Sequence, residues 1–155
     1  MNSNVAKNEE KSTWLVVDLG TTSIKGGLFH SNGDLIREAA HPNKPTQTEE
    51  GFHHQEIDTW WNGFKAVIHD LMSSEFVVQG IVLTGQMQNL IFLDSKSEPL
   101  HPIVSYSDQR GADQISSWSS QKSVQEQLLE TGNEQGPTSL LAKLAWFQQH
   151  QPEVL

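Results

Sequence analysis

The sequence predicts an α/β fold in which a three-stranded antiparallel meander is followed by a helix and a parallel strand. Three apolar segments separated by short turn signals lie within residues 13–40, which is typical of consecutive antiparallel strands. Residues 58–72 then place apolar side chains three and four positions apart, as on one face of a helix. A β-branched apolar run follows at residues 76–83. A chain of 155 residues is long enough for one domain with its own core.

The meander is the first part of this prediction. Residues 14–19 form the first strand, residues 23–29 the second and residues 35–40 the third. The sequence Ser-Asn-Gly-Asp at residues 31–34 is a dense turn signal between the last two strands. Two glycines at positions 26 and 27 lie inside the second strand, where glycine indicates a bulge or the close approach of another backbone.

A helix and a buried strand follow the meander. Residues 41–55 contain two prolines and repeated threonine and glutamate, so we expect a surface loop. Asp58 is placed to cap the next helix, which we expect to pack on the sheet. Because residues 76–83 are almost continuously apolar, we expect a strand that is buried on both faces. The apolar positions of the helix are Trp60, Trp61, Phe64, Val67, Ile68, Leu71 and Met72.

The C-terminal part alternates loops and helices. Residues 90–93 predict a further short strand, which a turn at residues 94–97 closes. A break with glycine and proline at residues 132–137 separates the last two of three predicted helices. These helices span residues 107–120, 123–130 and 139–149.

Charge and composition narrow the classes of partner. The formal net charge is −9, with 10 Lys and Arg against 19 Asp and Glu, which argues against binding to a nucleic-acid backbone. No run approaches the ~20 apolar residues that cross a bilayer. The chain has no cysteine, which excludes a disulfide framework or a thiolate site and fits a reducing compartment. We therefore expect a cytoplasmic protein with no nucleic-acid or membrane partner, whose residues 1–12 form a disordered tail.

The segment between the first two strands combines residue types that hold a phosphate group. Gly20 permits a tight turn, so backbone amides and the hydroxyls of Thr21, Thr22 and Ser23 can point into one concavity. Asp18, at the end of the first strand, is a candidate ligand for a hydrated Mg²⁺ beside the phosphates. These residues alone leave open an ordinary surface hairpin made of turn-favouring residues.

The order of elements is that of the ribonuclease H-like core used by sugar kinases, actin and heat-shock ATPases, and the motifs resemble one family with this core. The segment Asp18-Leu-Gly-Thr-Thr-Ser resembles the first phosphate motif of the FGGY carbohydrate kinases. Gln55 stands where that family has an acidic residue, and Gln88 stands where xylulokinases, the nearest subgroup by Met87, have histidine. Further segments similar to the family in order and spacing are residues 51–61, 84–94, 102–110 and 131–153.

The resemblance implies an ATP-dependent kinase that transfers the γ-phosphate of MgATP to a hydroxyl of a ketose or polyol, such as xylulose. It implies that the phosphates of ATP are bound by Asp18, Gly20, Thr21, Thr22 and Ser23, with Asp18 holding Mg²⁺ through water. It implies that the sugar is bound by Gln86, Met87, Gln88, Asp108 and Arg110. The family's general-base aspartate corresponds to a position beyond residue 155, so no residue of this chain receives that role.

The sugar-site residues have other interpretations when they are considered without the family. Met87 is as well suited to filling a core as to contacting a sugar. Asp108 and Arg110 are as well suited to a surface ion pair, a helix N-cap or a pair with each other as to ligand contact.

The resemblance assigns residues 13–155 to the N-terminal, sugar-binding domain of such a kinase, apparently incomplete and without the C-terminal ATP-binding domain. A full-length enzyme of this kind is a possible homodimer, and this chain alone is expected to be inactive. The alternative is a truncated, non-catalytic kinase lobe that binds sugar weakly or not at all. A ribonuclease H-type nuclease, which needs several carboxylates around two metals, and an actin-like assembly protein are further alternatives on the same core.

Overall fold

The computed structural model describes residues 12–47 and 51–155, and the chain forms two compact units. The sheet unit is Met1–Lys44 with Asp58–Gln86, and the helical unit is Pro45–Ile57 with Met87–Leu155. The tail expected at residues 1–12 lies outside the described residues except for Ser12. That residue begins the first strand, because it pairs with Val77 of a neighbouring strand.

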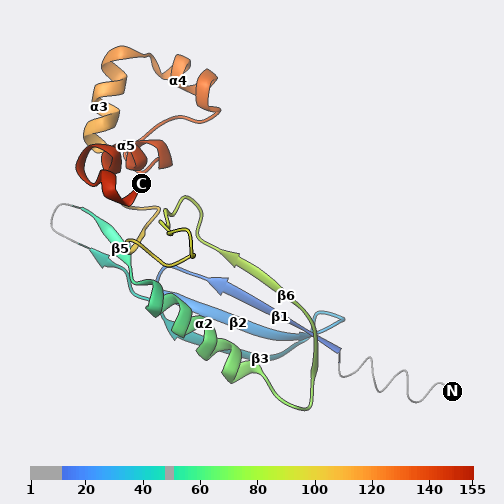
Figure 1. Cartoon of the computed structure of the whole chain (residues 1–155). Coiled ribbons are helices and arrows are strands. Elements are labelled where there is room, and N and C mark those ends of the chain that lie inside the picture. Colours follow the sequence, from blue (N-terminus) through green and yellow to red (C-terminus); the bar gives the residue numbers. More distant parts are fainter. Residues whose placement is uncertain (1–11, 48–50) are drawn as a thin grey trace. The chain divides into compact units, whose positions relative to one another are not determined.

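The sheet unit contains one mixed sheet, seen in Figure 1. Its strands are β1 (Ser12–Leu19), β2 (Ser23–His30), β3 (Leu35–Pro42) and β6 (Val77–Gly85). They lie in the order β3-β2-β1-β6, with β1, β2 and β3 antiparallel in sequence and β6 parallel to β1. Gly33, with a φ of 94°, closes the turn between β2 and β3. The predicted meander and the parallel fourth strand are both confirmed.

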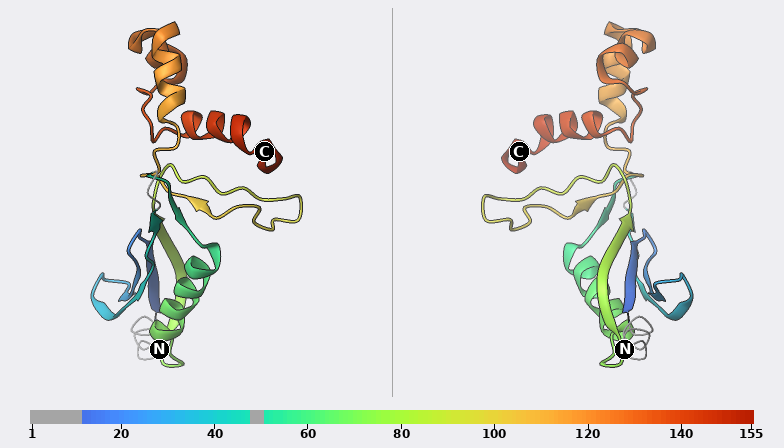
Figure 2. Two further views of the ribbon diagram at one scale, coloured as in Figure 1. Left: turned by 90° about the vertical axis from the view of Figure 1, so that its left-hand side faces the viewer. Right: turned by 90° about the vertical axis from the view of Figure 1, so that its right-hand side faces the viewer.

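Helix α2 (Ile57–Leu71) packs on one face of this sheet, as predicted (Figure 2). The helix begins at Ile57, so Asp58 lies in its first turn and not at the cap, where it was expected. Trp60 is partly buried, whereas 56% of Trp61 is exposed. The buried core consists of Leu15, Val17, Ile24, Val67 and Leu71.

The helix approaches the sheet closely at Gly26. A Cβ atom at this position would lie 2.4 Å from Cγ1 of Val67 and 2.8 Å from Cδ1 of Leu71. A glycine is therefore required here by the side chains of α2, since any larger residue would overlap them. The sequence predicted another backbone or a bulge at these glycines, but the atoms closest to Gly26 are helix side chains, and the irregularity in the pairing of β2 with β3 lies between Leu28 and Phe29.

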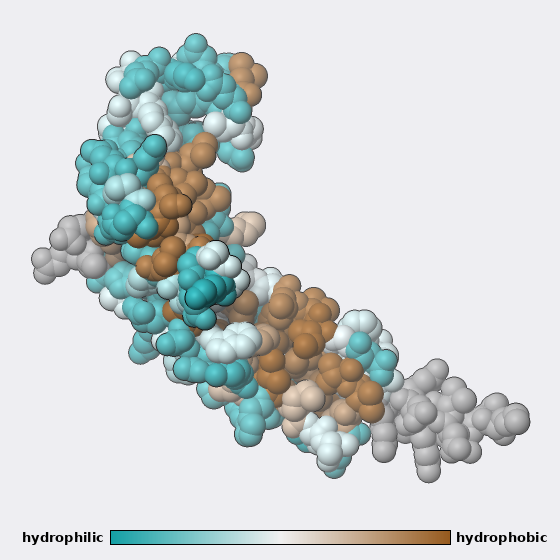
Figure 3. Space-filling model, in the orientation of Figure 1, coloured by the Kyte–Doolittle hydropathy of each residue, from teal (hydrophilic) through white to brown (hydrophobic). Residues whose placement is uncertain are grey.

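Strand β6 is not buried on both faces, so this expectation was wrong. The fractional exposures of Val77, Ile81, Val82 and Leu83 lie between 48% and 57%. Apolar residues gather over β6 in the view of Figure 3. Strand β6 is exposed because it lies at the end of the sheet, whereas the core lies over β1 and β2.

The helical unit contains a small antiparallel sheet in a region where a loop was expected. Its strands are β4 (Thr46–Gln47), β5 (His53–Gln55) and β7 (Ile103–Val104), in the order β4-β5-β7. His54 pairs with both Thr46 and Val104. The loop expectation for residues 41–55 failed because backbone pairing with β7, which is far away in sequence, outweighs the loop-like local composition.

The short strand expected at residues 90–93 was also wrong. Two isolated bridges form instead, between Leu90 and Val104 and between Leu93 and Pro99. Pro99 has no N–H to donate, so a regular ladder does not continue through it. The turn expected at residues 94–97 is confirmed, because Oδ1 of Asp94 accepts from the N–H groups of Lys96 and Glu98.

Three helices and a terminal 3₁₀ turn complete the helical unit. They are α3 (Ala112–Gln121), α4 (Val124–Thr131), α5 (Leu140–His150) and η1 (Pro152–Val154). Ser123 and Glu126 form a capping box at the start of α4, and Gly132 ends this helix with a φ of 74°. The last two predicted helices agree with the structure within one residue at each end. Across residues 12–47 and 51–155, no helix combines the length and apolar content needed to cross a membrane.

Candidate functional site

The phosphate turn predicted between the first two strands lies in the sheet unit and is defined by residues 18–23. Asp18 is the next-to-last residue of β1, and the register pairs it with Lys25 on β2 and Thr84 on β6. Directly opposite residues in a sheet point to the same face, so the carboxylate, the ammonium and the hydroxyl share one face. Lys25 is exposed there.

Gly20 gives this turn its shape. A Cβ at this position would lie 2.5 Å from the carbonyl oxygen of Ser23 and 3.4 Å from Oδ2 of Asp18. The first contact is with backbone, so a side chain could not be accommodated without moving the turn. Thr22 is exposed, while Thr21 and Ser23 are partly exposed, so the three hydroxyl residues are accessible to a ligand.

Asn43, which was not predicted as a site residue, forms two hydrogen bonds to the backbone of the phosphate turn. Its side-chain Nδ2 donates to the carbonyl of Gly20 at 2.9 Å, and its backbone N–H donates to the carbonyl of Thr22 at 2.9 Å. Asn43 is fully buried. The turn is therefore fixed by the residue that follows β3 as well as by its own glycine.

The first predicted sugar residue, Gln86, directly follows the end of β6 in the same unit. The parallel register pairs Gly85 with Leu19, so the residues after both strands leave the sheet at the same edge. Ligands of sheets with parallel strands commonly bind at this edge. The structure therefore brings Gln86 and the phosphate turn to the same edge of the sheet.

Met87 and Gln88 begin the main part of the helical unit. Met87 is 81% exposed, so core filling, the alternative interpretation of this residue, is wrong for the described part of the chain. Gln88 has a φ of 60°, in the left-handed region that few non-glycine residues adopt. Strain of this kind is retained where surrounding contacts hold the residue in place.

Asp108 and Arg110 pair with each other in the interior of the helical unit. Arg110 donates from Nε to Oδ1 of Asp108 at 2.8 Å and from Nη2 to Oδ2 at 3.0 Å. The carboxylate also accepts the backbone N–H of Arg110 at 3.0 Å and that of His53 at 2.7 Å. Asp108 is fully buried and Arg110 is 6% exposed. A pair was one of the open interpretations, but the expected surface location is wrong.

Aromatic rings surround the Arg110 guanidinium. Its central carbon lies 4.8 Å from the ring centroids of Phe52 and Phe147 and 4.9 Å from that of Trp146. Stacking of this kind stabilises a desolvated guanidinium. Because residues 107–111 form the turn that carries this ion pair, α3 begins at Ala112 and not at residue 107, where a helix was expected.

Lys143 of α5 is a second buried cation that the sequence analysis did not identify as a site residue. Its Nζ donates to the carbonyls of Gln88 at 2.8 Å and Ser105 at 3.0 Å. Burial lowers the pKa of Lys143 to about 8, against the opposing attraction of Asp108. The sequence signal was a lysine four positions before Phe147 on the buried face of an amphipathic helix.

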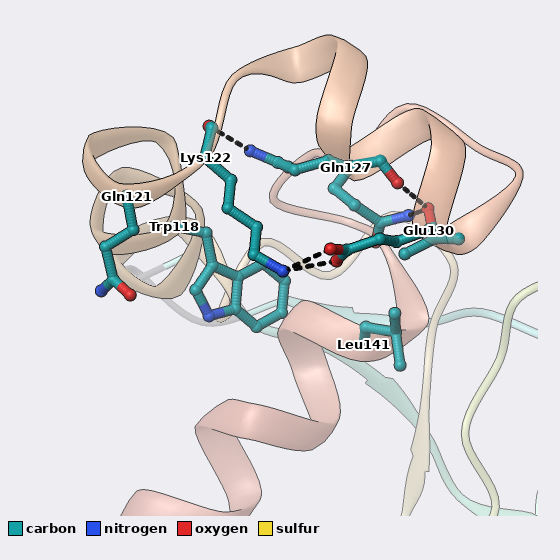
Figure 4. A pocket seen from close by; sticks show the side chains of 8 residues that line it. Trp118, Gln121, Lys122, Gln127, Glu130 and Leu141 are labelled. Carbon is teal, nitrogen blue, oxygen red and sulfur yellow. Dashed lines mark hydrogen bonds and ion pairs between the residues drawn. The ribbon is translucent and has the colours of Figure 1, made fainter.

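Cavities of about 320 and 180 Å³ lie within the described part of the helical unit. The larger, of about 320 Å³, lies among α3, α4 and α5, where Lys122 and Glu130 form an ion pair beside the ring of Trp118 (Figure 4). None of the predicted site residues lines it. The smaller, of about 180 Å³, is lined in part by Arg110, His101 and Trp146. Arg110 is therefore one predicted sugar residue that borders a cavity in this unit.

Asp18 is a candidate magnesium ligand, although the part of the chain that the structure describes forms no cage of protein ligands for the ion. Among the described residues, no three His, Cys, Asp or Glu side chains gather closely enough to form a metal site. Mg²⁺ usually keeps several waters and takes one or two carboxylates together with substrate phosphates. The partly exposed Asp18 beside the phosphate turn fits that mode of binding.

Comparisons with known proteins agree on one family. The model of the N-terminal domain of the FGGY family of carbohydrate kinases matches residues 13–155. The xylulose kinase of Lactococcus lactis is 31% identical over 145 residues, a match that covers 90% of this chain and 28% of that protein. The chain thus spans less than a third of the length of this relative.

Solved structures show the same fold. The crystal structure of xylulose kinase from Rhodospirillum rubrum matches with a TM-score of 0.84 and 26% identity, over 92% of this chain and 30% of that one. A gluconate kinase from Lactobacillus acidophilus matches with a TM-score of 0.82 and 23% identity, over 92% and 30%. The fold is therefore the ribonuclease H-like fold of the sugar kinases, as predicted, and it is shared by kinases named for different substrates.

Proposed function

Because the chain belongs to the FGGY family of carbohydrate kinases, we propose that it is the N-terminal, sugar-binding portion of an ATP-dependent kinase acting on a ketose or polyol. The family match over residues 13–155 carries this proposal. The nearest substrate class is xylulose-like, since several relatives are named xylulose kinases. The adenosine of ATP would be bound by a C-terminal domain outside this chain.

The phosphate turn supplies the part of phosphoryl transfer that this chain contributes. Such a transfer depends mainly on positioning and on stabilising charge around the β- and γ-phosphates. The hydroxyls of Thr21, Thr22 and Ser23 and the amides of the turn would donate to phosphate oxygens, with Gly20 allowing their close approach. Asp18 would hold Mg²⁺ through water, and the ion would neutralise phosphate charge when bound.

The sugar side of the reaction would involve Gln86, Met87 and Gln88. The exposed thioether of Met87 offers an apolar contact for the C–H face of a sugar, and the two flanking amides offer donors and acceptors for its hydroxyls. Asp108 uses both carboxylate oxygens within the protein. We therefore propose that Asp108 holds Arg110 in place and does not contact the sugar itself. Arg110 borders a cavity and remains the candidate for direct contact with the sugar.

The composition and charge of the chain support a proposal about its compartment and its partners. A chain without cysteine that uses sugar and ATP suits the cytoplasm, and we propose that compartment for it. Neither nucleic acid nor a membrane surface is proposed as a partner, because the net charge is −9. A homodimer of the full-length enzyme is part of the same proposal.

The first experiment measures the intact mass of the native product and its ADP release from MgATP with a panel of pentuloses, hexuloses and polyols. We expect a product of about three times this length, as the coverage of its relatives indicates, and release that depends on one sugar. A native product of 17.4 kDa without ADP release would instead support the alternative, a non-catalytic lobe.

The second experiment tests the phosphate turn in the active enzyme. Asp18→Ala should abolish turnover and leave the Kd for sugar nearly unchanged, because Asp18 is assigned to the metal and phosphates. Asp34→Asn, which changes an exposed carboxylate in the turn between β2 and β3, is the matched control and should retain activity. Loss of sugar binding with normal use of ATP in Asp18→Ala would contradict the assignment.

A further inference from the structure

Lys143 is buried in a way that packing alone does not explain. It has no solvent exposure, and the two acceptors of its Nζ are neutral backbone carbonyls. Burying an ammonium against neutral groups is costly compared with an apolar residue of similar volume. Its helix already buries Ala142 and Phe147 on the same side, so a methionine at position 143 would suit the core better.

The two carbonyls that Lys143 binds belong to the two segments predicted to contact sugar. One is the carbonyl of Gln88, the residue with the left-handed φ of 60°. The other is the carbonyl of Ser105, which also accepts the backbone N–H of Asp108 at 3.1 Å and so begins the turn that carries Arg110. One ammonium thus joins the loop at Met87 to the turn at Asp108.

Other hydrogen bonds that join these segments lie at Asn89 and Leu90. Leu90 and Val104 exchange both backbone hydrogen bonds at 3.0 Å, and Oδ1 of Asn89 accepts the N–H of Tyr106 at 2.7 Å. These contacts fix residues 89 and 90. The Lys143 ammonium adds the contact at Gln88 itself, next to the exposed Met87.

We propose that Lys143 is a positioning residue of the sugar site, which holds the backbone of Gln88 against the Ser105–Arg110 turn and so orients the side chains of Met87 and Gln88. This inference rests on the proposed function, because it assumes that these two side chains meet the sugar. Lys143 itself does not touch the sugar or the phosphates. Partners that orient the ligands of a metal site typically change affinity or activity by about 10- to 100-fold when they are removed, and we expect an effect of that order for Lys143.

The test uses Lys143→Met in the full-length kinase that carries this chain, with Lys122→Met as the matched control. Met keeps the volume and removes the N–H donors, whereas Lys122 is an exposed lysine of the same unit paired with Glu130. We expect Lys143→Met to raise the KM for sugar at least about tenfold, leave the KM for ATP unchanged and speed amide exchange at residues 87–90. Lys122→Met should change none of these quantities.

A second variant keeps the test decisive if Lys143→Met does not fold. Lys143→Gln retains N–H donors on a side chain one bond shorter, so its sugar KM should lie between those of wild type and a donor-free variant. The rise expected for Lys143→Gln is therefore more than twofold and smaller than that for Lys143→Met. A sugar KM within twofold of wild type in whichever of these variants folds would overturn the inference. A wild-type enzyme that uses no sugar, or Gln88→Ala with an unchanged sugar KM, would overturn the proposed function instead. In that case the rate of amide exchange at residues 87–90 would still show whether Lys143 holds this backbone in place.

Discussion

The substitution Asp108→Asn tests the buried ion pair most directly. It preserves the shape of the side chain but removes its charge and replaces one acceptor oxygen by an NH₂ group. The carboxylate accepts four hydrogen bonds, three from Arg110 and one from the N–H of His53. In the variant, at least one of these donors faces another donor. The Arg110 side chain, 3% exposed, then remains charged without a partner carboxylate.

The expected cost follows from the burial of this pair. Removing one partner of a buried ion pair costs about 3–5 kcal/mol, because the other charge is left uncompensated. The three rings around the guanidinium offset part of this cost through cation–π attraction, each by about 0.5–2 kcal/mol. We therefore expect a loss of about 3 kcal/mol in the unfolding free energy of the helical unit, at the lower end of that range.

Native-state hydrogen exchange measures this loss within one unit. The N–H groups of Leu90 and Val104 each donate to the carbonyl of the other residue. They should exchange about a hundredfold faster in Asp108→Asn, because a loss of about 3 kcal/mol is about twice the 1.4 kcal/mol that corresponds to a factor of ten. Glu130→Gln breaks the exposed pair with Lys122 and should cost only about 0–1 kcal/mol. Equal effects of the two substitutions on these amides would refute the argument that burial makes the Asp108 pair strong.

The remaining predictions concern packing, pH and the phosphate turn. Gly26→Ala should lower the unfolding free energy measured in urea by about 1–3 kcal/mol, because the added Cβ overlaps Val67. Gly136→Ala, where a Cβ meets nothing within 4 Å, should change it by less than about 0.5 kcal/mol. Similar changes in both variants would contradict the overlap. The pKa of Lys143 is lowered from 10.5 to about 8 in the folded chain, so the unfolded chain binds more protons between these values. The unfolding free energy should therefore rise from pH 8 to pH 10.5 by up to about 3 kcal/mol in wild type and not in Lys143→Met, and parallel pH curves would count against this burial. Asn43→Ala removes the donor to Gly20, so it should lower the unfolding free energy by about 1 kcal/mol and raise the KM for ATP in the full-length enzyme. Asn32→Ala, in an exposed turn, is its control. An unchanged KM for ATP in Asn43→Ala would show that Asn43 does not hold the phosphate turn in its working shape.

Local patterns determined the elements whose formation depends on neighbours in sequence. The alternation and turn residues of residues 14–40 predicted the meander, and the three- and four-residue spacing of apolar residues predicted α2 and α5. Gly132 marked the end of α4 because a left-handed φ there suits glycine. These signals act within a few residues, so one sequence is enough to detect them.

The tertiary structure alone decided what is buried and what pairs across long separations in the chain. Composition could not show that β6 is an exposed end strand, because burial depends on which distant elements cover a strand. Nor could spacing show that Asp108 accepts the N–H of His53 or that Lys143 binds the carbonyl of Gln88, since each contact joins residues 55 positions apart. The sequence determined the meander, α2 and the last two helices, together with the family and the candidate site residues. Contacts between distant residues determined which of those side chains face solvent and which are buried.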